Sequence, residues 1–256
     1  MAIDEVDTID ECPNFLNEST NIQINTEPID ENFGTWMASD AFYIPKYGKA
    51  PLGEDAHFIC IEEQTIGVAD GVGGWAKRGI DSGEYAREFV RNAKLSIHKQ
   101  REQKNKIDPK KVLNEAYLNT ISQGNIGKSD DPSVAQEIEV PVEIWDVIVM
   151  GSDGLFDNVH NFELEALVQD GLIDLYELED TKMLARKIAE YALKNSENKL
   201  ICTPFSTESL KAGKQRIGVK RDDITVIVAN ILPLQFHLCY VIRYIIVGVT
   251  AKEYMC

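Results

Sequence analysis

Short apolar runs that alternate with polar positions predict the strands of this chain. Segment 57–70 (HFICIEEQTIGVAD) predicts two strands joined by a turn at Glu62–Gln64. A strand rich in β-branched residues is predicted at 144–150, and an alternating core strand at 222–231. Segment 238–251 is very apolar but shorter than the roughly 20 residues that span a bilayer, so we expect a buried or edge strand.

Apolar positions spaced by three and four residues predict the helices. The predicted helices span 82–103, 108–120, 161–170 and 181–195. We expect Ser82 to cap the first helix and Asp180 to cap the last, while Asp108 and Pro109 are typical of a helix start. Strands of antiparallel type mixed with long helices indicate an α+β fold, in which helices cover the faces of the sheets.

The two ends of the chain differ from the middle. Residues 1–35 are polar and acidic without periodicity, which predicts a flexible lead-in. Residues 233–256 form an apolar tail with no assigned role, in which Arg243 interrupts the apolar run. The amino terminus shows neither an apolar signal segment nor an Arg-rich transit peptide, so the default expectation is a cytoplasmic, monomeric protein.

Charge narrows the possible partners. The 256 residues carry 42 acidic and 26 basic side chains, a net charge of −16. This balance argues against nucleic acid and against anionic membranes, which both need a basic face. The surplus of carboxylates fits a solvated surface or a cluster that holds divalent cations. The five cysteines form no C-x-x-C pair, which indicates free thiols in a reducing compartment.

Acidic residues recur beside glycine or in pairs at the ends of the predicted strands. These places are Gly53-Glu54-Asp55, Asp70-Gly71, Asp153-Gly154 and Asp222-Asp223. One Asp-Gly pair alone is most often a turn. Four such places at strand ends favour one shared carboxylate site, because a carboxylate there is costly unless paired or bound to a cation. Mg²⁺ and Mn²⁺ prefer such oxygen ligands.

Four ordered motifs carry a family resemblance. GEDAHFI, VADGVGGW, GSDGLFDNV and KRDDITVIVAN resemble the PP2C-type metal-dependent serine/threonine protein phosphatases, and DGVGGW is similar to the PTC7-like branch. The resemblance covers residues 36–231 and implies a phosphatase domain at 36–232 with an αββα four-layer sandwich. It also implies phosphoprotein substrates, and it keeps an organellar location open beside the cytoplasmic default, because PTC7-like relatives are often organellar.

The resemblance implies a centre with two or more Mg²⁺ or Mn²⁺ ions. The implied metal ligands are Glu54, Asp55, Asp70, Gly71, Asp153 and Asp222. Asp70 and Asp153 would act in catalysis through a metal-activated water that attacks phosphorus. Lys46 and Lys49 are candidates to orient the phosphate, with solvated loop lysines as the alternative. Val72 replaces the histidine of many relatives, which leaves the proton donor unassigned.

The chain departs from the family between Leu118 and Asp131, where family members place several central strands. More than about 50 residues are missing, judged from the usual size of such domains. The sandwich is therefore expected to be truncated in its central sheet, with apolar strand edges exposed. Two functions stay open: an active phosphatase, and a catalytically impaired pseudo-phosphatase that serves as a binding or regulatory module. A haloacid-dehalogenase site is disfavoured because Gly151 stands where the nucleophilic aspartate would be.

Overall fold

Apolar residues alternate along the strand β5 (Ile224–Pro233), and its two faces contribute to two different cores. The computed structural model describes residues 34–71, 81–122, 132–171, 178–214 and 220–234. One face of β5 packs under the helix α5 (Leu178–Glu197), and the other packs against the strand β3 (Thr65–Ala69). The predicted strand 222–231 is therefore a central core strand.

The strands form two antiparallel sheets. In the first sheet, β5 lies between β1 (Thr35–Ile44) and β4 (Val147–Gly151). The second sheet of the described residues is the hairpin of β2 (Ala56–Cys60) and β3. The side chain of Gln64 joins the two sheets, since it bonds both the amide and the carbonyl of Met37 in β1.

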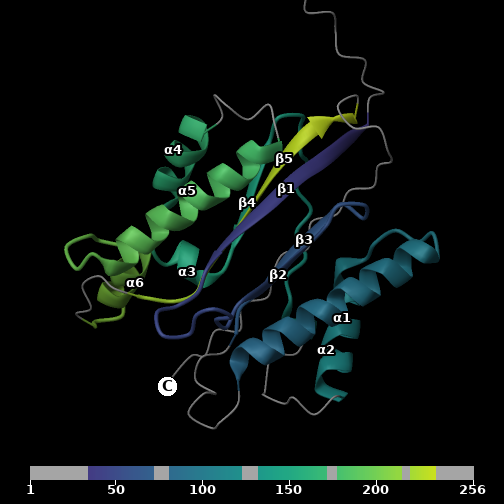
Figure 1. Ribbon diagram of the computed structural model, residues 1–256, viewed down its shortest axis with the longest axis horizontal. Helices are drawn as coiled ribbons and strands as arrows, with labels where there is room; N and C mark the ends of the chain where they lie inside the picture. The colour runs from purple at the N-terminus through teal and green to yellow at the C-terminus, as the bar shows by residue number, and fades with distance from the viewer. Residues whose placement is uncertain (1–33, 72–80, 123–131, 172–177, 215–219, 235–256) are drawn as a thin grey trace, which may run out of the picture. The chain divides into compact units, whose positions relative to one another are not determined.

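Helices cover the outer face of each sheet (Figure 1). The hairpin is covered by α1 (Ser82–Glu102), which packs against α2 (Pro109–Ser122). The three-stranded sheet is covered by α5 with α4 (Asn161–Gly171) and α3 (Asp153–Phe156); the short helix α6 spans Pro204–Lys211. Three separate apolar cores thus lie between four layers in the order αββα, which confirms the predicted α+β sandwich.

Several predicted boundaries were wrong. Ser82 is the first residue of α1, and the side chain of Asp81 accepts the cap hydrogen bond from Gly83 N at 3.0 Å. Asp180 lies inside α5, which begins at Leu178. β4 begins at Val147 rather than at residue 144, because Trp145 has a positive φ of 76° that interrupts the extended backbone.

Some predictions concern residues outside the described part of the chain. These include most of the acidic lead-in, Val72, the loop at 123–131 and the apolar segment 238–251. Within the described part, no helix is long and apolar enough to cross a membrane.

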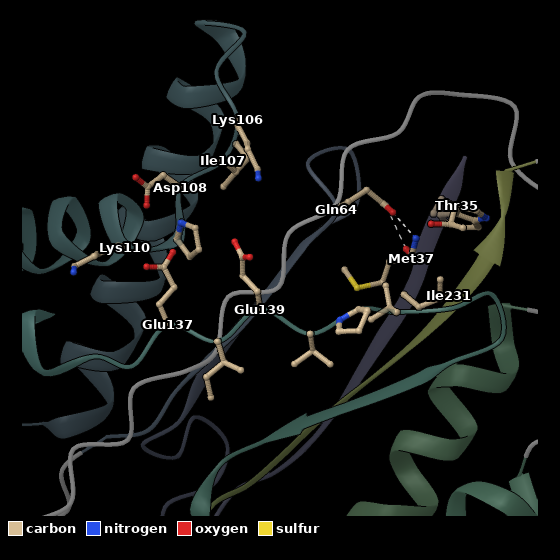
Figure 2. A pocket seen from close by; sticks show the side chains of 16 residues that line it. Thr35, Met37, Gln64, Lys106, Ile107, Asp108, Lys110, Glu137, Glu139 and Ile231 are labelled. Atoms are coloured by element: carbon tan, nitrogen blue, oxygen red, sulfur yellow. Dashed lines mark hydrogen bonds between the residues drawn. The ribbon is translucent and has the colours of Figure 1, made fainter. Parts of the chain in front are cut away.

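A cavity of about 960 Å³ lies beside the turn between α1 and α2. Its floor includes Met37 and Ile231, and the coil 137–142 runs along one side (Figure 2). This coil follows the block where we expect the central strands to be missing. Ile138 and Val140 of the coil are 63% and 66% exposed, so apolar side chains of the described residues face solvent here. β3 itself is buried along its whole length, between α1 and the first sheet.

Candidate metal centre

The four motifs meet because of how the strands pair. Ala56 of β2 faces Ala69 of β3, so Asp55 and Asp70 flank the open end of the hairpin. In the other sheet, Gly151 at the end of β4 faces Val226 near the start of β5. This pairing brings the segment that begins α3 close to Asp222, just before β5.

Two hydroxyl side chains tie three motifs together. The amide of Ser152 donates to the carbonyl of Thr225 at 3.2 Å, and the amide of Thr225 donates to Ser152 Oγ at 3.1 Å. Thr225 Oγ1 then donates to Asp55 Oδ2 at 2.7 Å. Asp55 is therefore held in one orientation by a residue that belongs to the opposite sheet.

Glycines allow the motif backbones to approach closely. A Cβ on Gly154 would lie 1.9 Å from the carbonyl oxygen of Asp223, so only glycine fits there. A Cβ on Gly71 would lie 2.4 Å from the carbonyl oxygen of Glu54. The glycines that follow Asp70 and Asp153 are thus a packing requirement of this corner.

The carboxylates raise the pKa of their neighbours. Burial, followed by the charges of Asp55, Asp153 and Asp222, raises the pKa of Asp70 to about 9. The pKa of Asp55 is raised to about 6, first by burial and then by Asp223 and Asp222, against the lowering effect of its hydrogen bonds from Ser152 and Thr225. Asp70 is thus both buried and surrounded by like charges, and each of these raises its pKa.

Three lysines pair with these carboxylates. Lys46 Nζ lies 3.1 Å from Asp222 Oδ1, and Lys49 pairs with the buried Glu54. Lys220 contacts Asp153, lies 2.6 Å from Asp157 Oδ2 and lies 3.8 Å from Asp222 Oδ2. Although burial alone lowers the pKa of Lys220, the hydrogen bonds to Asp153 and Asp157 raise it above its usual value.

The charge balance of this corner fits divalent cations. Seven carboxylates take part, namely Glu54, Asp55, Asp70, Asp153, Asp157, Asp222 and Asp223. When all seven are ionised, the three lysines leave four negative charges unbalanced among the described residues, which equals the charge of two divalent cations. Asp223 Oδ2 is also buried without a hydrogen-bond partner among the described residues. Among those residues, no three side chains already form a metal-ligating group.

Every implied ligand therefore lies at this corner, and several further residues lie there that the sequence analysis did not single out. Asp157 and Lys220 stand within the recognised motifs, a few residues from the predicted ligands. Tyr43 comes from β1 and donates to Asp223 Oδ1 at 2.5 Å. Burial and this hydrogen bond raise the pKa of Tyr43. No local sequence signal marks Tyr43, because only the pairing of β1 with β5 brings it here.

The chain is similar in sequence to known protein phosphatases. No family model matches the chain. "Probable protein phosphatase 2C 55" of Arabidopsis thaliana is 36% identical over 273 residues, covering 87% of this chain and 56% of the relative. "Probable protein phosphatase 2C 80" of the same plant is 34% identical, covering 76% of this chain and 58% of the relative. The chain spans a little over half the length of these relatives.

Two further similarities agree with these. "Protein phosphatase PTC7 homolog fig" of Drosophila grimshawi is 26% identical, covering 70% of this chain and 80% of that protein. The X-ray structure of the photosystem II phosphatase PBCP superposes with a TM-score of 0.64 at 23% identity, covering 76% of this chain and 98% of that one, which shows the shared fold. The chain shares more than a third of its aligned residues with a plant relative, and it has the fold of a known phosphatase. It therefore belongs to the PP2C family of protein phosphatases.

Proposed function

We propose that this chain is a metal-dependent phosphatase that removes phosphate from phosphoserine and phosphothreonine in proteins. The proposal rests on the convergence of Asp55, Asp70, Asp153 and Asp222 from four separate motifs at one end of the two sheets. Family membership implies dependence on divalent metal and a phosphoprotein substrate. The cytoplasmic location and the monomeric state stay predictions.

In this proposal, Glu54, Asp55, Asp70, Asp153 and Asp222 would hold two Mg²⁺ or Mn²⁺ ions together with the carbonyl of Gly71. Such ions supply a nucleophilic water at neutral pH and polarise a phosphoryl oxygen. The net charge of the site supports this assignment, because among the described residues the carboxylates exceed the lysines by four charges, which two divalent ions would neutralise.

The chain's own side chains prepare the site. Thr225 orients Asp55 through a direct hydrogen bond, and Ser152 in turn accepts a hydrogen bond from the amide of Thr225. Lys46 and Lys49 are 35% and 34% exposed, so each can turn from its carboxylate toward a phosphate that arrives from solvent. Both lysines therefore remain candidates to orient the substrate, although each pairs with an acidic side chain in this structure.

A second candidate function is a pseudo-phosphatase that binds phosphoproteins without turnover. The hairpin has two strands in the described part of the chain, and a cavity of about 960 Å³ lies beside it. The alignment with the first relative runs over 273 positions, more than the 256 residues of this chain, so that relative carries residues that this chain lacks. A sandwich missing such residues could hold the ligands too loosely for catalysis.

Hydrolysis of p-nitrophenyl phosphate and of a phosphothreonine peptide by the purified full chain in Mn²⁺ separates the two candidates. We expect turnover by the wild type and its loss in Asp70→Asn and Asp153→Asn. Asp170→Asn is the matched control, because Asp170 is 72% exposed and pairs with Lys187, and neither residue belongs to the four motifs. Wild-type turnover no higher than that of Asp70→Asn would exclude the active enzyme and favour the pseudo-phosphatase.

A further inference from the structure

Lys220 contacts more carboxylates than either of the other two lysines of the candidate metal centre. Its ammonium contacts Asp153, lies 2.6 Å from Asp157 Oδ2 and lies 3.8 Å from Asp222 Oδ2. Its side chain is 22% exposed, less than those of Lys46 and Lys49. One cation thus bridges three carboxylates from two separate motifs.

The position of Lys220 is fixed by its surroundings. Asn158 Nδ2 donates to the carbonyl of Lys220 at 3.1 Å and to the carbonyl of Gly154 at 2.9 Å, which joins the two motifs through their backbones. The ammonium also lies 5.9 Å from the ring centroid of Phe205, whose amide donates to the carbonyl of Asp157 at 3.0 Å. These contacts hold the ammonium at the carboxylates rather than in solvent.

We propose that Lys220 is a built-in counter-ion that occupies the place of a divalent cation between Asp153 and Asp222. This inference rests on the proposed function, because both aspartates are proposed metal ligands. A divalent ion held by Asp153 and Asp222 would compete with the ammonium for the carboxylate lone pairs and would repel its positive charge, so metal binding displaces Lys220 from these contacts. The lysine keeps its proton and its charge during this exchange; only its contacts with the carboxylates change.

Two consequences follow from this exchange. The metal-free chain is stabilised because Lys220 offsets the repulsion between Asp153 and Asp222. Metal affinity is lowered by the same interaction, because the incoming ion must break it. Lys46 provides the comparison, since it contacts one carboxylate at 3.1 Å and is more exposed, so its removal should change metal affinity less.

Calorimetric titration of the full chain with Mn²⁺ tests the inference. We expect Lys220→Met to bind Mn²⁺ about tenfold more tightly than wild type, or more, as expected for loss of a competing charge-assisted contact. Lys46→Met should gain less, and Lys211→Met should match wild type because Lys211 pairs with Glu208 on the surface. Equal or weaker binding by Lys220→Met overturns the inference and leaves the metal centre standing, whereas absence of binding in every protein overturns the metal centre itself.

A second measurement uses the wild-type chain and does not depend on how the variant folds. Amine-reactive labelling followed by mass spectrometry reports the reactivity of each lysine with and without Mn²⁺. We expect saturating Mn²⁺ to raise the labelling rate of Lys220 several-fold while Lys211, whose side chain is 68% exposed, stays constant. An unchanged rate at Lys220 in a chain that binds Mn²⁺ contradicts the displacement.

Discussion

The two ends of the paired strands β1 and β5 are packed very differently. At the end where Ile44 faces Ile224, the carboxylates, lysines and hydroxyls of four motifs are joined by hydrogen bonds and ion pairs. At the other end, where Thr35 faces Pro233, the structure opens into a cavity of about 960 Å³ bordered by exposed apolar side chains. In the described part of the chain, one sheet therefore carries a closely packed polar site at one end and an open cavity at the other.

The difference between the two ends shows that the motifs supply the polar site but not the cover of the opposite end. Each acidic motif lies next to a strand that pairs locally or with β5, so the site assembles from segments that the chain retains. The open end is bordered by residues between α2 and β4, the region in which we expect the central strands to be missing. The site can thus keep its chemistry while the sandwich loses part of its cover.

The largest expected effect is at the polar end. Asp70→Asn should lower Mn²⁺-dependent turnover by at least about 100-fold, because it removes the carboxylate that lies among Asp55, Asp153 and Asp222. Near pH 9, where the carboxyl of Asp70 is partly ionised, the same change also relieves repulsion, so without metal the variant should unfold at an equal or higher temperature than the wild type. Turnover assays and thermal melts in EDTA check both effects, and a variant that is less stable in EDTA would contradict the repulsion.

The sequence predicted this end well because its signals are local. Alternation marks β2, β3 and β5, and an aspartate stands beside each of these strands. Lys220 was not recognised as part of the site, because a lysine that contacts carboxylates of two motifs is visible only once the chain is folded.

The sequence predicted the remaining sheet less well. β1 is not predicted because TWMASDAFYI has no clean alternation, and its extended backbone is set by pairing with β5, which lies far along the chain. Ser82 was assigned as a cap from its residue type, whereas in the structure its hydroxyl bonds the carboxylate of Glu54. Both errors come from long-range contacts that override local preference.

The next effect is a dependence of stability on pH. The pKa of Asp70 is about 9 in the folded chain against an ordinary value of 3.8, so the folded chain binds more protons than the unfolded chain between these values. Stability without metal should therefore fall as the pH rises from about 6 to 9, by about 1 kcal/mol per pH unit. Urea unfolding in EDTA at several pH values measures this slope, and Asp70→Asn should flatten it; an equal slope in both proteins would assign it to other groups.

A smaller effect is expected where the two sheets are joined by a hydroxyl. Thr225→Val keeps the shape of a fully buried residue but removes the donor to Asp55 Oδ2, at a cost of about 1–3 kcal/mol in the free energy of unfolding. Thr207→Val is the control, since the hydroxyl of this α6 residue donates to the carbonyl of Thr203, which caps the helix, and does not contact Asp55. Chemical denaturation of both variants should show the larger loss for Thr225→Val, and the pKa of Asp55 should rise further without this hydrogen bond.

The smallest effect belongs to the open end. Ile138 is 63% exposed on the coil beside the cavity, so Ile138→Ala should change the free energy of unfolding by less than about 0.5 kcal/mol. Ile231 lines the same cavity but is 5% exposed within the core between the sheets, so Ile231→Ala should cost about 2–4 kcal/mol. Urea unfolding of the two variants locates the boundary between core and open surface. A large loss for Ile138→Ala would mean that the coil is covered in solution, and the contrast between the two ends of the sheet would then disappear.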